Sequence, residues 1–134
     1  MTEEGYNGQF KRVFLPNYEL RFNKRLQKGG VAANVMPHST RKVWGIIAEL
    51  DDNDLKAMDR YEGHPYHYER KQVDVFLENG DRVNAYIYIA HPQRIIEEKL
   101  PSYEYLGYII RGAKMCGLPL DYINAIEALG RGIV

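Results

Sequence analysis

Alternating apolar and polar positions predict strands in the first half of the chain. Four segments have strand character: residues 13–15, 18–23, 31–36 and 43–50. In the second of them, Tyr18, Leu20 and Phe22 alternate with polar residues, as in a strand with one buried face. A turn at Lys28-Gly29-Gly30 separates it from the third. Residues 43–50 form the most continuous β-branched apolar run, so we expect them to form a central strand.

The alternation over residues 70–90 predicts a β-hairpin and the length of its loop. The apolar positions of its two strands are Val73, Val75 and Leu77, and Val83, Ala85, Ile87 and Ile89. A two-residue Asn-Gly turn would pair Phe76 with Val83 and place the two apolar sets on opposite faces. A three-residue loop, with Gly80 in the left-handed conformation, pairs Val75 with Val83 and unites them. We therefore predict the three-residue loop.

Three short helices follow from apolar stripes flanked by capping residues. The first covers residues 51–63, where Asp51 is a good N-cap and Gly63 suits the left-handed residue that ends a helix. The other two run from Pro101-Ser102 to Met115 and from Leu120 to Leu129, the last ended by Gly130. The helices and strands do not alternate as in βαβ units. We therefore predict an α+β fold, a small mixed β-barrel with flanking short helices.

The composition indicates a single globular domain over residues 1–134. Eighteen basic and eighteen acidic residues give no net charge, so we expect no nucleic-acid partner and no attraction to an anionic membrane. No apolar run approaches the ~18 residues of a membrane helix, and the N-terminus lacks the features of a signal peptide. Cys116 is the only cysteine, which excludes an internal disulfide and favours a cytoplasmic location.

Glu62 is the residue whose position points to chemistry. The apolar stripe of the first predicted helix contains Leu55 and Met58, and the next positions on that face are Tyr61 and Glu62. Glu62 thus continues a core-facing stripe at the negative end of its helix. Burial and this helix pole both disfavour the charged carboxylate and should raise its pKa, as in a general acid/base. The alternative is a solvent-exposed glutamate at a frayed helix end.

Other candidate sites have less support. His64 and His67 lie close together without an acidic or Cys partner at ligand spacing, so we expect no metal and no cofactor. Gly29-Gly30 lacks the following helix and the Gly-Lys-Ser/Thr of a phosphate-binding loop, and Cys116 lies on a helix stripe typical of core positions. One partly buried carboxylate near tyrosine hydroxyls suits proton transfer in a reaction whose nucleophile belongs to the substrate.

A series of motifs also follows a known order from about residue 15 to the C-terminus. These motifs are Leu15-Pro16-Asn17-Tyr18-Glu19-Leu20-Arg21-Phe22-Asn23, Gly29-Gly30-Val31-Ala32, residues 43–50, Asp59-Arg60-Tyr61-Glu62-Gly63, the strand beginning at Tyr68, Pro101-Ser102-Tyr103-Glu104-Tyr105 and Gly117-Leu118-Pro119. Together they resemble the gamma-glutamylcyclotransferase-like family, which includes the AIG2-like proteins. The resemblance implies an enzyme that releases 5-oxoproline from a gamma-glutamyl peptide, amine or amino acid.

The resemblance also implies roles for three residues. In such an enzyme the substrate's own α-amine attacks the γ-carbonyl, and a glutamate takes and returns the proton. Glu62 falls on the position of that glutamate, which makes it the expected catalytic residue. Tyr68 and Tyr105 match tyrosines that line the family's pocket, so they are the expected substrate-binding residues.

One part of the family's pattern is missing from this sequence. The family opens with a strand and a Tyr-Gly-Ser-Asn-type loop that cradles the γ-glutamyl end, whereas Gly5-Tyr6-Asn7-Gly8 has another order and no apolar strand before it. Either the sequence is truncated or this member has lost the loop. A missing first strand would leave an unpaired sheet edge and favour a homodimer. The alternatives are therefore an active cyclotransferase, a non-catalytic AIG2-like binding or regulatory module, and an incomplete domain.

Overall fold

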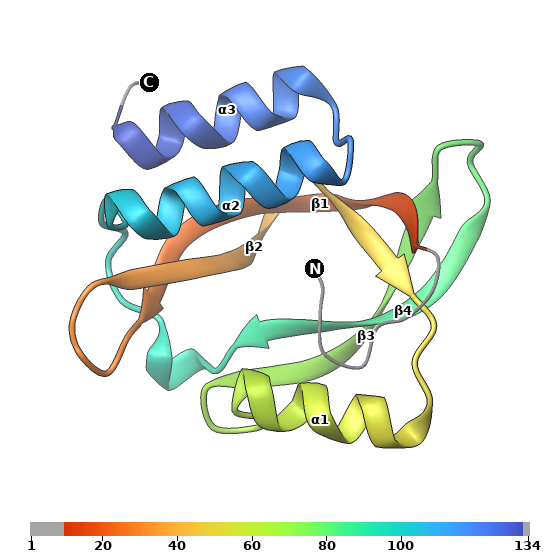
Figure 1. Cartoon of the computed structure of the whole chain (residues 1–134), viewed down its shortest axis with the longest axis horizontal. Helices are drawn as coiled ribbons and strands as arrows, with labels where there is room; N and C mark the ends of the chain where they lie inside the picture. Colours follow the sequence, from red (N-terminus) through yellow and green to blue (C-terminus); the bar gives the residue numbers. More distant parts are fainter. Residues whose placement is uncertain (1–9, 133–134) are drawn as a thin grey trace.

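A four-stranded antiparallel sheet and three α-helices make up the fold (Figure 1). The structure is a computed structural model that describes residues 10–132, and the features expected of residues 1–9 lie outside this range. The elements are β1 (Phe10–Arg25), β2 (Val31–Ala48), α1 (Asp52–Glu62), β3 (Tyr68–Leu77), β4 (Arg82–Ala90), a 3₁₀ turn η1 (Pro92–Arg94), α2 (Tyr103–Met115) and α3 (Leu120–Arg131). The α+β class is confirmed.

The first two strands are longer than predicted. Residues 13–15 and 18–23 belong to one strand, β1, with a register shift beside Asn17, whose φ of 65° is left-handed. Residues 31–36 and 43–50 likewise fall largely within one strand, β2, which contains Pro37. A proline without an N–H is tolerated there because β2 is an edge strand of the described sheet, in the order β2-β1-β3-β4. The prediction of a central strand at residues 43–50 was therefore wrong.

The sheet is not closed into a barrel, and it is antiparallel throughout, so the mixed barrel was also wrong. β1 pairs with β3 only at Val13 and Phe14, and β2 and β4 remain the edges of the described sheet. A side-chain hydrogen bond of Asn34 joins these edges instead of a backbone ladder, and a second bond ties Asn34 to β1. Oδ1 of Asn34 in β2 accepts from the Ala90 N–H in β4 at 2.8 Å, and its Nδ2 donates to Oδ1 of Asn23 at 3.2 Å.

The β3–β4 hairpin has the predicted geometry. Val75 pairs with Val83, and Gly80 has a φ of 95°. The Leu77 N–H donates to the Asp81 carbonyl at 2.9 Å, closing the loop. The apolar alternation was sufficient to choose between the two loops, because the three-residue loop places both apolar sets on the same face and the two-residue loop does not.

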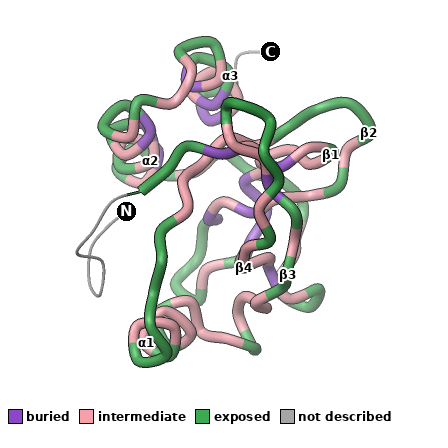
Figure 2. Tube along the Cα trace, turned by 90° about the vertical axis from the view of Figure 1, so that its right-hand side faces the viewer, coloured by how far each residue is buried: buried purple, intermediate pink, exposed green. Residues whose placement is uncertain are grey.

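The helices lie on two sides of the sheet. α2 and α3 pack together against β1 and β2, whereas α1 lies at the far side, beside β3 and β4 (Figure 1). Figure 2 shows buried segments in α2 and α3, while α1 contains no fully buried residue. α3 continues through Gly130, where a helix end was predicted. A Cβ at Gly130 would lie 2.5 Å from Leu106 Cδ1, so this glycine allows α3 to approach α2 rather than ending the helix.

Candidate active site

Helix α1 presents Glu62 at its C-terminal end, as the sequence predicts. The Asp51 side chain accepts from the Asp54 N–H at 2.8 Å, and Gly63 ends the helix with a φ of 70°. A Cβ at Gly63 would lie 2.8 Å from Cδ2 of His67. Gly63 is therefore required both for its backbone conformation and for the close approach of the loop that follows Glu62.

Asp59 attaches this helix to the sheet, a role that the sequence reasoning missed. The Tyr88 hydroxyl on β4 donates to Oδ1 of Asp59 at 2.6 Å, and Nη1 of Arg70 on β3 donates to Oδ2 at 2.8 Å. These charge-assisted bonds leave α1 little freedom to turn or slide along the sheet. Because Asp59 and Glu62 are one turn apart, the same contacts fix where the Glu62 side chain begins.

Tyr68 and Tyr105 meet at the backbone of one residue on the edge strand β2. The Tyr68 hydroxyl donates to the Ala33 carbonyl at 2.8 Å, and the Tyr105 hydroxyl accepts from the Ala33 N–H at 2.9 Å. The two tyrosines thus provide hydrogen-bond partners for the N–H and the carbonyl of Ala33. These groups lie on an edge strand, where no further strand of the described sheet pairs with them. Their chemistry differs as a result. Tyr68 commits its proton to Ala33, whereas Tyr105 retains its own O–H proton for another acceptor.

Glu62 interacts electrostatically with both tyrosines. Burial raises the pKa of Glu62, and the positive charge of Lys24 acts in the opposite direction. Burial is also the main cause of the raised pKa values of Tyr68 and Tyr105, and the negative charge of Glu62 raises both further. The structure therefore brings the three residues expected at the site into one neighbourhood, and the expected direction of the Glu62 pKa is confirmed.

Lys24 is a fourth member of this neighbourhood, and the sequence reasoning missed it. It is only 4% exposed, its Nζ lies 3.1 Å from Nδ1 of His67, and it lies 5.3 Å from the centre of the Tyr68 ring. Burial is the largest cause of its lowered pKa, followed by the charges of Arg94 and Arg25. The signal was present in the sequence, because Lys24 continues the alternation of Tyr18, Leu20 and Phe22 toward the core.

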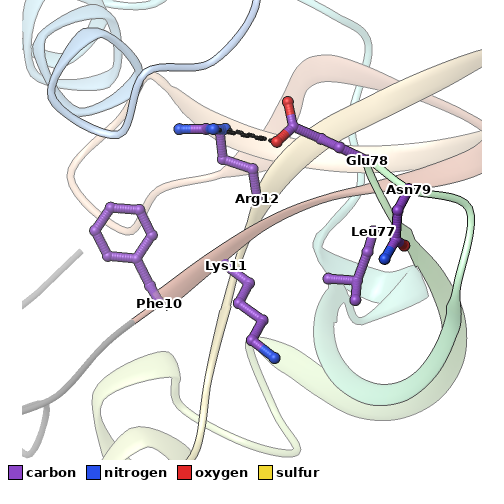
Figure 3. A pocket seen from close by; sticks show the side chains of 6 residues that line it. All are labelled: Phe10, Lys11, Arg12, Leu77, Glu78 and Asn79. Carbon is purple, nitrogen blue, oxygen red and sulfur yellow. Dashed lines mark hydrogen bonds and ion pairs between the residues drawn. The ribbon is translucent and has the colours of Figure 1, made fainter.

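A separate surface hollow lies at the start of β1 and the β3–β4 turn, away from these residues in the sheet. Figure 3 shows the six side chains that line it, Phe10, Lys11, Arg12, Leu77, Glu78 and Asn79. Two of these residues, Arg12 and Glu78, form an exposed ion pair at 3.1 Å. None of the predicted site residues lines the hollow. Within residues 10–132, no three His, Cys, Asp or Glu side chains gather as a metal site. Nor does that part of the chain contain a helix long and apolar enough to cross a membrane.

Comparison with known proteins assigns the chain to a family. The model of the AIG2-like family matches residues 42–126, a range that contains Glu62, Tyr68 and Tyr105. The chain belongs to the AIG2-like family. Lys24 lies outside the matched range, so the family match carries no information about it.

Relatives of this AIG2-like chain include named gamma-glutamylcyclotransferases. The human gamma-glutamylcyclotransferase is 28% identical over 102 residues, which make up 75% of this chain and 52% of the human protein. A protein of Methanocaldococcus jannaschii is 31% identical over 70 residues, or 48% of this chain and 58% of its own length. A solved structure of a gamma-glutamyl cyclotransferase matches with a TM-score of 0.78 at 26% identity, covering 88% of this chain and 72% of that one. The chain thus spans about half the length of the curated relatives that it matches.

Proposed function

We propose that this AIG2-like protein is a gamma-glutamyl cyclotransferase that releases 5-oxoproline from a gamma-glutamyl peptide, amine or amino acid. The observation that carries the proposal is the partly buried Glu62, whose pKa is raised by burial, beside Tyr68 and Tyr105. The names of the relatives support the reaction class. A carboxylate whose pKa is raised by burial is a better proton acceptor than an exposed one and can return the proton later in the reaction, which suits general acid/base catalysis.

In the proposed mechanism, the substrate supplies the nucleophile and Glu62 carries the proton. The α-amine attacks the γ-carbonyl carbon, forming the C–N bond of the five-membered ring. Glu62 takes a proton from this amine and returns it to the leaving nitrogen as the original amide bond breaks. No proton is gained or lost over the cycle, so the site needs one acid/base group and donors for the developing oxyanion.

The tyrosines have distinct roles in this proposal. Tyr105 binds substrate through its O–H, which remains available because its oxygen accepts from the Ala33 N–H. Tyr68 shapes the pocket with its ring and holds β2 through the Ala33 carbonyl. No metal or cofactor takes part, and the γ-glutamyl compound is the only partner that the reaction requires.

The direct test is 5-oxoproline release from a panel containing a γ-glutamyl peptide, a γ-glutamyl amine and a γ-glutamyl amino acid. Glu62→Gln removes the acid/base group while keeping the shape, and the exposed Glu49→Gln is the matched control. We expect release by the wild type and by Glu49→Gln but not by Glu62→Gln. Ligand binding without turnover by any of the three proteins would instead favour the non-catalytic binding module.

Three further expectations belong with this proposal. The cytoplasmic location, the lack of a nucleic-acid partner and the homodimer through an unpaired sheet edge stay predictions. The open edges for such a dimer are β2 and β4 of the described sheet, except near Ala33 and Asn34, whose groups are already bonded. Sedimentation that shows a monomer at micromolar concentration would contradict the homodimer.

A further inference from the structure

Lys24 is a buried cation held rigidly in the candidate site. Lysine is seldom buried to this degree unless it is paired, yet Lys24 is 4% exposed. Its backbone is fixed on both sides, because it pairs with Ala32 of β2 and bridges to Ile95 on the segment after η1. The strand that carries Lys24 is therefore held in place by neighbours on both of its sides.

The ammonium group of Lys24 has one hydrogen-bond partner among the described residues. Its Nζ lies 3.1 Å from Nδ1 of His67, and burial and the neighbouring cations lower the pKa of that imidazole, which favours a neutral ring that accepts the bond. No carboxylate of residues 10–132 lies within ion-pair distance of Nζ. An ammonium group has three N–H donors, so two are left for a ligand.

The charge around Lys24 favours an anionic ligand. Arg25 and Arg94 both act electrostatically on Lys24, while Glu62 is the carboxylate that acts on it. Glu62 itself is shifted toward its neutral form by burial. A buried, poorly compensated positive charge does not stabilise the fold, because desolvation of the ammonium is not offset by an ion pair. Binding of an anion would provide that compensation.

We infer that Lys24 binds the α-carboxylate of the γ-glutamyl group. The inference rests on the proposed function, in which the α-amine gives its proton to Glu62. The α-carboxylate and the α-amine are attached to the same carbon, and Lys24 and Glu62 are close enough to influence each other's charge. When Lys24 holds the α-carboxylate, the α-amine is directed toward Glu62. Tight binding of the substrate then requires the carboxylate.

The product and a decarboxylated analogue provide a matched pair of probes. 5-Oxoproline and 2-pyrrolidinone have the same lactam ring, and only the first has a carboxylate. We expect the wild type to bind 5-oxoproline about 10- to 100-fold more tightly than 2-pyrrolidinone, as for a desolvated ion pair. Calorimetry or an NMR titration measures both affinities without turnover. Equal binding of the two compounds by the wild type would overturn the inference.

Substitutions then assign this preference to Lys24. Lys24→Met, which keeps an unbranched apolar chain, should bring the two affinities together, and Lys24→Arg should keep part of the preference. The exposed Lys28→Met is the matched control and should bind as the wild type does. A thermal unfolding transition first shows that the Lys24→Met protein is folded. If the folded variant still binds 5-oxoproline in preference to 2-pyrrolidinone as strongly as the wild type does, the inference is overturned.

The Glu62→Gln protein separates this inference from the proposed function. Loss of 5-oxoproline release in Glu62→Gln, with an unchanged preference for 5-oxoproline over 2-pyrrolidinone, supports both. Full release by Glu62→Gln with a Lys24-dependent preference would refute the catalytic role of Glu62 and support the role of Lys24. If release depends on Glu62 but Lys24→Met does not change the preference for 5-oxoproline over 2-pyrrolidinone, the inference about Lys24 is overturned and the proposed function stands.

Discussion

The Tyr88 hydroxyl donates a hydrogen bond of 2.6 Å to Oδ1 of Asp59, one helical turn before Glu62. This bond joins α1 to β4, and Arg70 adds a second bond from β3 to the same carboxylate. The position of the candidate catalytic residue thus depends on contacts made by a different residue of its helix. Asp59 acts as a positioning residue in this account, because it bonds to the sheet rather than to substrate.

Tyr88→Phe tests this attachment. The substitution removes only the hydroxyl, so we expect a loss of about 1.5–3 kcal/mol in the free energy of unfolding, as for a hydrogen bond to a charged group. We also expect kcat to fall while KM changes little, since α1 is held less firmly. Tyr86→Phe is the control. The Tyr86 ring centre lies 4.7 Å from Cζ of Arg70, a contact that phenylalanine keeps, and the Tyr86 hydroxyl has no bond to Asp59. Identical kcat and denaturation midpoints for the two variants would contradict the role of Asp59.

Gly63→Ala tests the turn after Glu62. Alanine at a φ of 70° is strained, and its Cβ would also lie 2.8 Å from Cδ2 of His67. Gly80→Ala is matched in its positive φ of 95° but has open space around the new Cβ. We expect Gly80→Ala to lose about 1 kcal/mol of stability and Gly63→Ala to lose more. Urea denaturation gives both values, and an equal loss would show that the contact with His67 relaxes without penalty.

The two tyrosines at Ala33 should differ in their effect on catalysis. Tyr68→Phe and Tyr105→Phe each remove one hydrogen bond to the same residue, so we expect similar losses of about 1 kcal/mol in stability. Only Tyr105→Phe also removes a proton that the substrate can accept. We therefore expect kcat/KM to fall further in Tyr105→Phe than in Tyr68→Phe. Steady-state kinetics decide the point, with the exposed Tyr103→Phe as control.

The stability of Glu62→Gln should depend on pH relative to the wild type. Burial raises the folded-state pKa of Glu62, so its contribution to stability is full below the ordinary glutamate pKa of about 4.3 and is lost as pH rises through the raised value. Glutamine does not titrate. We expect the Tm of Glu62→Gln, relative to the wild type, to increase from acid to neutral pH, while Glu49→Gln shows no such trend. A constant difference across this range would mean that Glu62 titrates as an exposed glutamate.

The sequence was sufficient for features decided by local patterns. Asp51 and Gly63 define α1, and the alternation around Val75 and Val83 defines the hairpin loop. Glu62 could be selected because it continues an apolar stripe, and the partly buried position in the structure agrees with this. In each of these cases the deciding neighbours lie within a few residues or across one turn.

Features that depend on distant contacts were missed or misjudged. Residues 13–15 and 18–23 were predicted as separate segments, as were residues 31–36 and 43–50. A left-handed Asn17 and an edge position for Pro37 allow each pair to lie in one strand. The sheet edges are joined through Asn34 and Ala90, which are far apart in sequence and carry no pairing signal. Lys24 was overlooked because lysine is usually exposed, although its place in the alternation pointed to the core.

The central claim is that Glu62 transfers the proton during cyclisation, and kcat for 5-oxoproline release measures this most directly. At saturating γ-glutamyl substrate, we predict that Glu62→Gln lowers kcat by about 10²- to 10⁴-fold, while Glu49→Gln leaves it unchanged. The binding preference for 5-oxoproline over 2-pyrrolidinone should persist in Glu62→Gln, which shows that the pocket is intact. A folded Glu62→Gln protein with the kcat of the wild type would contradict the claim.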